Sequence, residues 1–165
     1  ADDEVDDLFD LVKGDLVKFI SDHKGSAGDE AIDLIMIAKY LERIGDHAAD
    51  ISEMTILMAG TPYIRNIEHL QTMAKEAMVM LVKSIEAYVE KDLAKAEKVS
   101  ESDDVIDDLF DEIKAELIDA IHQNPDNGEQ AADLLMVSKY LERIGDHATN
   151  IAEWVIFSIT GNHPG

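Results

Sequence analysis

Hydrophobic residues recur three and four positions apart along most of the chain, which is the spacing of one face of an α-helix. The clearest stripe lies in the second half and consists of Leu134, Val137, Leu141, Ile144, Ala148, Ile151 and Val155. The first half repeats it at Leu34, Ile37, Leu41, Ile44, Ala48 and Ile51. Such alternating steps are typical of helices that pack along a coiled-coil-like seam. Because no period-two alternation occurs, the pattern predicts an all-α fold.

The stripes and the turn signals between them predict five helices, at roughly 2–24, 28–59, 62–90, 92–122 and 127–160. Thr61-Pro62 is expected to start the third helix, since proline is favoured at the first helical position. Asp92 is the expected N-cap of the fourth helix. Clusters rich in glycine, asparagine and serine separate the first helix from the second and the fourth from the fifth.

The chain contains an internal duplication. The ten residues KYLERIGDHA occupy positions 39–48 and again 139–148, and the motif DDLFD at positions 6–10 recurs at 107–111. Repeats this long indicate two copies of one small domain. We therefore divide the chain into a first repeat at residues 1–60 and a second repeat at residues 61–165.

The two copies differ in helix number. The second has three predicted helices and forms a complete three-helix bundle, whereas the first bundle lacks its first helix. The repeat offset would place that helix about 40 residues before Ala1. The sequence leaves three explanations: the chain is a fragment, another molecule supplies the helix, or a short protein carries an open first bundle. If another molecule supplies the helix, a homodimer is one expected arrangement.

The charge balance excludes several classes of function. The chain has 36 Asp and Glu residues against 14 Lys and Arg residues, a net charge of −22. A surface this acidic repels nucleic-acid backbones and anionic membrane leaflets, so neither nucleic-acid binding nor direct membrane insertion is expected. The absence of cysteine excludes disulfides, thiolate metal sites and cysteine nucleophiles. A hydrophobic content of 46% is nevertheless that of a globular protein.

Acidic side chains stack one helical turn apart on two successive helices of each repeat. On a helical wheel they fall on the outer face, away from the hydrophobic seam. The second repeat places Asp103 and Asp107 before Glu142 and Asp146; the first repeat places Asp2 and Asp6 before Glu42 and Asp46. Like charges at this spacing repel. A cation shared between the helices would explain the arrangement, because carboxylate oxygens suit hard metal ions.

Gly45 and Gly145 lie between the seam and the acids and would let the neighbouring helix approach closely. Surface salt bridges are the alternative, because Lys39 and Arg43 each precede an acid by three residues, as do Lys139 and Arg143.

Other candidate chemistry is weaker. His47 and His147 each follow the key aspartate directly, and we expect structural hydrogen bonds from them rather than metal ligation. No phosphate-binding glycine loop or nucleophile–base arrangement is recognisable, so an enzyme is not indicated. A di-metal enzyme would need ligands on the apolar seam, where none occur.

With its duplicated KYLERIGDHA segments, its acid-rich preceding helices and its period near 100, essentially the whole chain resembles the PhoU family of phosphate-signalling proteins. The resemblance implies tandem three-helix bundles with paired acidic motifs that hold metal clusters in some members. Matched position by position, the metal ligands would be the eight acids of the two repeats: Asp2, Asp6, Glu42, Asp46, Asp103, Asp107, Glu142 and Asp146. The ions would be divalent or ferric: iron, zinc, manganese or magnesium.

The same resemblance implies a function. The chain would be a cytoplasmic, non-enzymatic negative regulator of phosphate uptake and of the phosphate-starvation response. It would be peripheral to the inner membrane and would link the phosphate ABC transporter to a membrane sensor histidine kinase. The alternative from another class is a metal-free acidic helical adaptor that docks onto basic surfaces of its partners.

Overall fold

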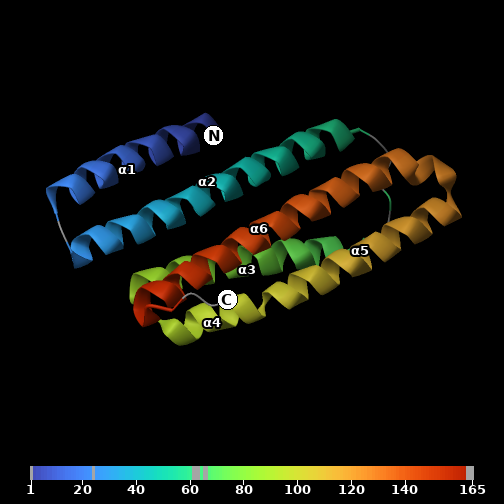
Figure 1. Ribbon diagram of the computed structural model, residues 1–165. Coiled ribbons are helices and arrows are strands. Elements are labelled where there is room, and N and C mark those ends of the chain that lie inside the picture. The colour runs from blue at the N-terminus through green and yellow to red at the C-terminus, as the bar shows by residue number, and fades with distance from the viewer. Residues whose placement is uncertain (1, 24, 61–63, 65–66, 163–165) are drawn as a thin grey trace.

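The described elements are all helices. The computed structural model describes residues 2–23, 25–60, 64 and 67–162 (Figure 1). In chain order the elements are α1 (Asp2–Asp22), α2 (Ser26–Met58), α3 (Glu68–Glu90), α4 (Leu93–Glu101), α5 (Asp103–Gln123), the short 3₁₀ helix η1 (Pro125–Asn127) and α6 (Gly128–Thr160). The predicted all-α fold is confirmed.

The two longest helices, α2 and α6, pack along each other and form the centre of the molecule. They run in opposite directions, so the two copies of the ten-residue segment face each other (Figure 1). Helix α1 packs on α2, whereas α3, α4 and α5 all pack on α6. The α1–α2 pair of the first repeat thus corresponds to the α5–α6 pair of the second. None of the described helices combines the length and the apolar composition needed to cross a membrane.

Two predicted helix bounds were wrong. The segment expected as one helix from 92 to 122 is broken at Ser102, whose hydroxyl donates to the Lys98 carbonyl oxygen and whose carbonyl accepts from Val105 N–H. This local bonding competes with a continuous helix. The third helix begins at Glu68 rather than at 62, because the Ile64 N–H donates to the Gln130 side chain instead of entering a helix. Thr61 and Pro62 lie outside the described residues.

The hydrophobic core lies around α6. Ile151 and Ala152 of α6 are fully buried, as are Ile106 and Ile113 of α5 and Met73 of α3. Helix α6 receives packing partners on several sides, which is why apolar positions outside the predicted seam are also buried in it. His69 fastens α3 to α5 because its Nδ1 lies 2.5 Å from Glu116 and its Nε2 lies 3.0 Å from Glu112.

Equivalent residues of the two repeats differ in burial. Leu109 and Ile113 of α5 are buried, but their counterparts Leu8 and Val12 in α1 are 62% and 39% exposed. The difference has a simple cause, since α3 packs against both α5 and α6 and no described helix occupies that position in the first repeat.

Truncating equivalent isoleucines should therefore have unequal effects on stability. Ile151→Ala removes a fully buried side chain and should lower the free energy of unfolding by about 2–5 kcal/mol. Ile51→Ala, at the half-buried equivalent position, should cost about 1 kcal/mol. Urea denaturation of the two variants measures the difference. Equal losses would contradict the asymmetric core.

Candidate metal centre

Three carboxylates from two helices converge in the first repeat. One oxygen from each of Asp6 in α1, Glu42 and Asp46 in α2 lies within 4.8 Å of the other two. Glu42 and Asp46 are half-buried and Asp6 is exposed. Among the described residues this is the one group of three or more His, Asp or Glu side chains that meets so closely. Its donor set consists of oxygen alone, which suits a hard cation.

Gly45 and Gly145 bring the acid-bearing helices together. A Cβ on Gly45 would lie 3.2 Å from Val5 Cγ1 of α1, and a Cβ on Gly145 would lie 3.3 Å from Ile106 Cγ2 of α5. Both distances are shorter than ordinary carbon–carbon contacts. The predicted close approach is therefore present in both repeats, and it places the acids of α1 beside those of α2 and the acids of α5 beside those of α6.

In the second repeat several of the acids have partners within the chain. Lys139 donates to Glu142 Oε2, and Arg143 Nη1 lies 3.9 Å from Asp146 Oδ2. The Thr149 hydroxyl donates to Asp103 Oδ1 at 3.2 Å. The lysine also sits 5.2 Å from the Phe110 ring centroid. These contacts are the surface salt bridges that the sequence left open as the alternative, and they hold part of the acidic cluster without an ion.

The crowding of carboxylates changes their protonation. Burial and then the charges of Asp46 and Asp6 raise the pKa of Glu42 above its ordinary value. Burial and then Asp103 and Glu142 raise the pKa of both Asp107 and Asp146. Each raised pKa means that the folded protein resists the ionised form. A bound cation would remove that penalty.

The acids are less exposed than the helical wheel predicted. The Glu142 side chain is only 16% exposed and the Asp146 side chain is 38% exposed. They lie beside the neighbouring helix, because the glycines allow it to approach, and not on a fully solvated outer face. Asp103 is half-buried and Asp107 is exposed. Asp2 belongs to α1, but its side chain lies outside the described part of the structure.

His47 and His147 stack on each other where α2 crosses α6. Their ring centroids are 5.4 Å apart and the rings are 8° from parallel. Each ring also stacks on the tyrosine of the opposite repeat, His47 on Tyr140 and His147 on Tyr40. Burial, together with His47 and two arginines, lowers the pKa of His147 to about 4. The expected hydrogen-bonding role is thus replaced mainly by stacking, although His47 Nδ1 lies 3.5 Å from Asp50.

The sequence analysis did not identify the side chains that pack against the two glycines. Val5 and Ile106 precede the two DDLFD motifs directly, so the internal repeat could have indicated them. It also missed Thr149 as a hydrogen-bond donor to Asp103. The internal repeat could not indicate this contact, because alanine occupies the equivalent position 49 of the first repeat.

Comparison with known proteins gives consistent family matches. A family model described as the PhoU domain matches residues 1–55 and 70–155. A phosphate-specific transport system accessory protein PhoU homolog of Clostridium acetobutylicum is 32% identical over 163 residues, covering 97% of this chain and 74% of the relative. One from Rhizobium meliloti is 35% identical over 136 residues, covering 82% of this chain and 57% of the relative.

A solved structure has the same fold. The crystal structure of PhoU from Pseudomonas aeruginosa superposes with a TM-score of 0.92 at 24% identity, covering 98% of this chain and 78% of that one. The likeness supports the helical architecture, including the position of α1 and α2 beside the second bundle.

The raised pKa of Glu42 predicts a pH effect on stability. The folded protein holds the proton to higher pH than the unfolded chain, so stability should fall as pH rises from about 4.5 through the raised value. In chelator at neutral pH, Glu42→Gln should therefore raise the melting temperature by about 1–2 °C, as expected for removing like-charge repulsion. Glu53→Gln, an exposed acid on the same helix, is the control and should change little. A lower melting temperature for Glu42→Gln would contradict the repulsion.

Proposed function

Because this chain belongs to the PhoU family, we propose that it is a non-enzymatic regulator of phosphate uptake and of phosphate-starvation signalling. The observation that carries the proposal is the family match across both repeats, with relatives named as accessory proteins of a phosphate-specific transport system. The convergence of three carboxylate side chains from two helices supports a binding role rather than catalysis.

The proposed partners are the phosphate ABC transporter and a membrane sensor histidine kinase. We place the protein in the cytoplasm, where it would restrain the starvation response when phosphate is plentiful. It would reach the inner membrane through these partners, which agrees with a charge of −22 that disfavours direct contact with anionic lipid.

The acidic clusters are proposed to hold hard metal ions. Asp6, Glu42 and Asp46 would bind one ion, and an equivalent ion would lie among Asp103, Asp107, Glu142 and Asp146. The ion would supply positive charge that neutralises the carboxylates and joins α1 to α2, or α5 to α6. The raised pKa of Glu42 supports this assignment, since burial and neighbouring acids already disfavour its ionised state.

A metal-free acidic adaptor is the second candidate function. The ion pairs of Lys139 with Glu142 and of Arg143 with Asp146 favour it for the second repeat, because they supply internal counter-charges. An adaptor of this kind would bind basic partner surfaces with an affinity that falls steeply with salt and does not respond to a chelator. A metal-dependent regulator would lose its partner affinity in the chelator.

Metal binding can be tested with two adjacent aspartates. Asp6→Asn removes one of the three converging carboxylates and should lower the affinity for Mn²⁺ about tenfold or more, as measured by calorimetry on metal-stripped protein. Asp7→Asn removes the same charge from the next, exposed position of α1 and should leave affinity nearly unchanged. Equal effects of the two variants would show that Mn²⁺ is attracted by the acidic surface in general and not by this cluster. If the wild-type protein does not bind Mn²⁺, the proposal of a metal site is wrong.

The regulatory role calls for a cellular measurement. Expression of this chain in a bacterium that lacks its own PhoU should restore repression of a phosphate-starvation reporter in phosphate-rich medium. Glu42→Ala/Asp46→Ala should restore less repression at equal protein abundance if the metal-binding form is the active one. Full derepression with a folded, abundant wild-type chain would contradict the regulator function, whatever the metal result.

A further inference from the structure

A buried carboxylate without a partner lies at the end of the α2–α6 pair that is remote from the loop joining α2 to α3. Asp33, in the second turn of α2, is only 9% exposed. Within the described part of the chain, no hydrogen bond or salt bridge reaches its oxygens. Burial, Asp29 and Glu30 raise the pKa of Asp33, in that order of size, and the positive charge of Lys91 lowers it by less. Burying a carboxylate that has no hydrogen bond or salt bridge is costly, so the residue calls for an explanation.

The start of the helix explains the neighbours of Asp33 but not Asp33 itself. Asp29 and Glu30 are exposed near the N-terminus of α2, where negative charge is favourable. Asp33 is one turn further along and is largely buried. It lines two cavities, of about 370 Å³ and about 420 Å³, which receive side chains from α2 and α6, with α3 contributing to the smaller.

The smaller cavity has the chemistry of a cation site. Asp33 and Glu30 supply two carboxylates, and Tyr88 supplies an aromatic side chain. The two acids raise the pKa of the Tyr88 phenol, after burial, which places their negative charge close to its ring. Lys91 also lines the cavity, but its side chain is 72% exposed and its Nζ lies 3.4 Å from Glu30, so it acts on Asp33 through its charge and not through a salt bridge.

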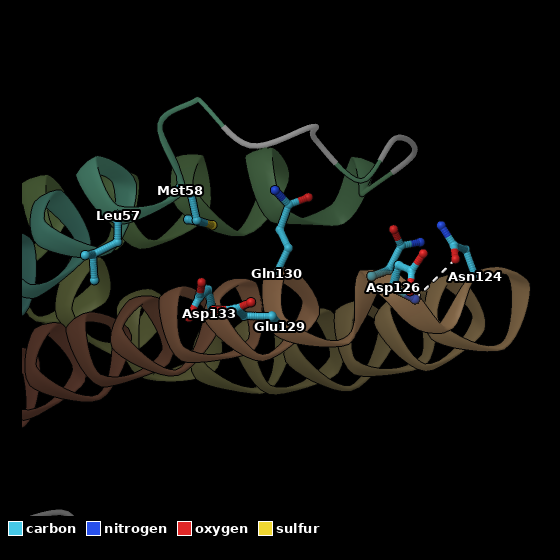
Figure 2. A pocket seen from close by; sticks show the side chains of 8 residues that line it. Leu57, Met58, Asn124, Asp126, Glu129, Gln130 and Asp133 are labelled. Carbon is cyan, nitrogen blue, oxygen red and sulfur yellow. Dashed lines mark hydrogen bonds between the residues drawn. The ribbon is translucent and has the colours of Figure 1, made fainter.

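The opposite end of the α2–α6 pair provides an internal comparison. Asp133, the repeat counterpart of Asp33, lines a cavity of about 500 Å³ beside Leu57, Met58 and Gln130 (Figure 2). Asp133 is half-buried, and the described residues that line its cavity include neither an aromatic residue nor a lysine. The two aspartates therefore differ in burial and in the described residues around them.

We propose that the cavity at Asp33 receives a lysine or arginine side chain from a segment of a partner protein. The partner's cation would pair with Asp33 and Glu30 and lie near the Tyr88 ring. Exposed apolar residues of α3 form a stripe that leads to the cavity: Met78, Val82, Ile85 and Val89, the last of which lines it. A segment with apolar residues and one basic residue matches this surface in apolar character and in charge. The inference is independent of the metal sites and of the regulatory role.

Two helical peptides provide the probe. Both carry one apolar side chain per turn, and they differ in one position that holds arginine in the first and its uncharged isostere citrulline in the second. We expect the arginine peptide to bind saturably and at least tenfold more tightly than the citrulline peptide, with shifts in the amide NMR spectrum centred on Asp33, Tyr88 and Val89. The indole of Trp154, the chain's only tryptophan, lines the neighbouring cavity and serves as a second reporter.

Matched substitutions separate a built site from general attraction to an acidic protein. Asp33→Asn should weaken the arginine peptide about tenfold, whereas Asp133→Asn, which removes the same charge at the opposite end, should leave its affinity unchanged. Lys91→Met should strengthen binding two- to threefold, because it removes a competing cation at the cavity. If Asp33→Asn fails to fold, Glu30→Gln replaces it, since Glu30 is exposed and its loss should weaken binding at least twofold.

Several results would overturn the proposal. Equal affinity for the arginine and citrulline peptides would show that the cavity does not recognise a positive charge. Equal weakening by Asp33→Asn and Asp133→Asn would show that the peptide is attracted by the acidic surface in general and not by the cavity at Asp33. Weaker binding by Lys91→Met would mean that the lysine helps to hold the peptide rather than competing with its cation. Spermidine binding as tightly as the arginine peptide would assign the cavity to a free polyamine instead of a protein partner.

Discussion

The packing of α2 against α6 is the constraint on which the other arrangements depend. Each of these helices carries a glycine on one side, which receives α1 or α5, and a histidine on another, which meets its own duplicate. At this crossing His147 is uncharged at neutral pH, since burial lowers its pKa to about 4. The acidic clusters of the two repeats and the cavities at the two ends are all built on these two helices, so their positions depend on how α2 and α6 pack.

The acidic clusters gain their properties from close backbone approach. Without Gly45 and Gly145, α1 and α5 would stand further away, and the facing carboxylates would be well separated and solvated. Close approach instead half-buries Glu42 and Asp146 and sets them against acids from the next helix, so their pKa values rise. The same geometry that disfavours the ionised carboxylates would favour a bound cation, as proposed above.

Helical periodicity and duplication allowed much of this to be predicted from the sequence. The seam of α6, the position of the acids and the purpose of the two glycines are local properties, repeated twice. The late start of α3 could not be predicted, because it depends on Gln130, which is 66 positions away from Ile64. The break at Ser102 depends on local hydrogen bonds of the Ser102 hydroxyl and carbonyl, which a helical pattern of apolar residues does not predict. The cavity at Asp33 is lined by residues of three helices, which no single hydrophobic stripe predicts.

The stacked histidine pair also bears on how the two halves of the gene could diverge. Tyr40 and His47 contact Tyr140 and His147, and all four belong to the ten residues that are identical in both copies. A substitution in one copy therefore alters the surroundings of the other, so a single change disturbs both halves at once. Residues far from this contact have no such mutual dependence: Asp33 and Asp133 now occupy different surroundings. A substitution at the shared centre is therefore felt in both repeats, whereas one at Asp33 or Asp133 stays at its own end.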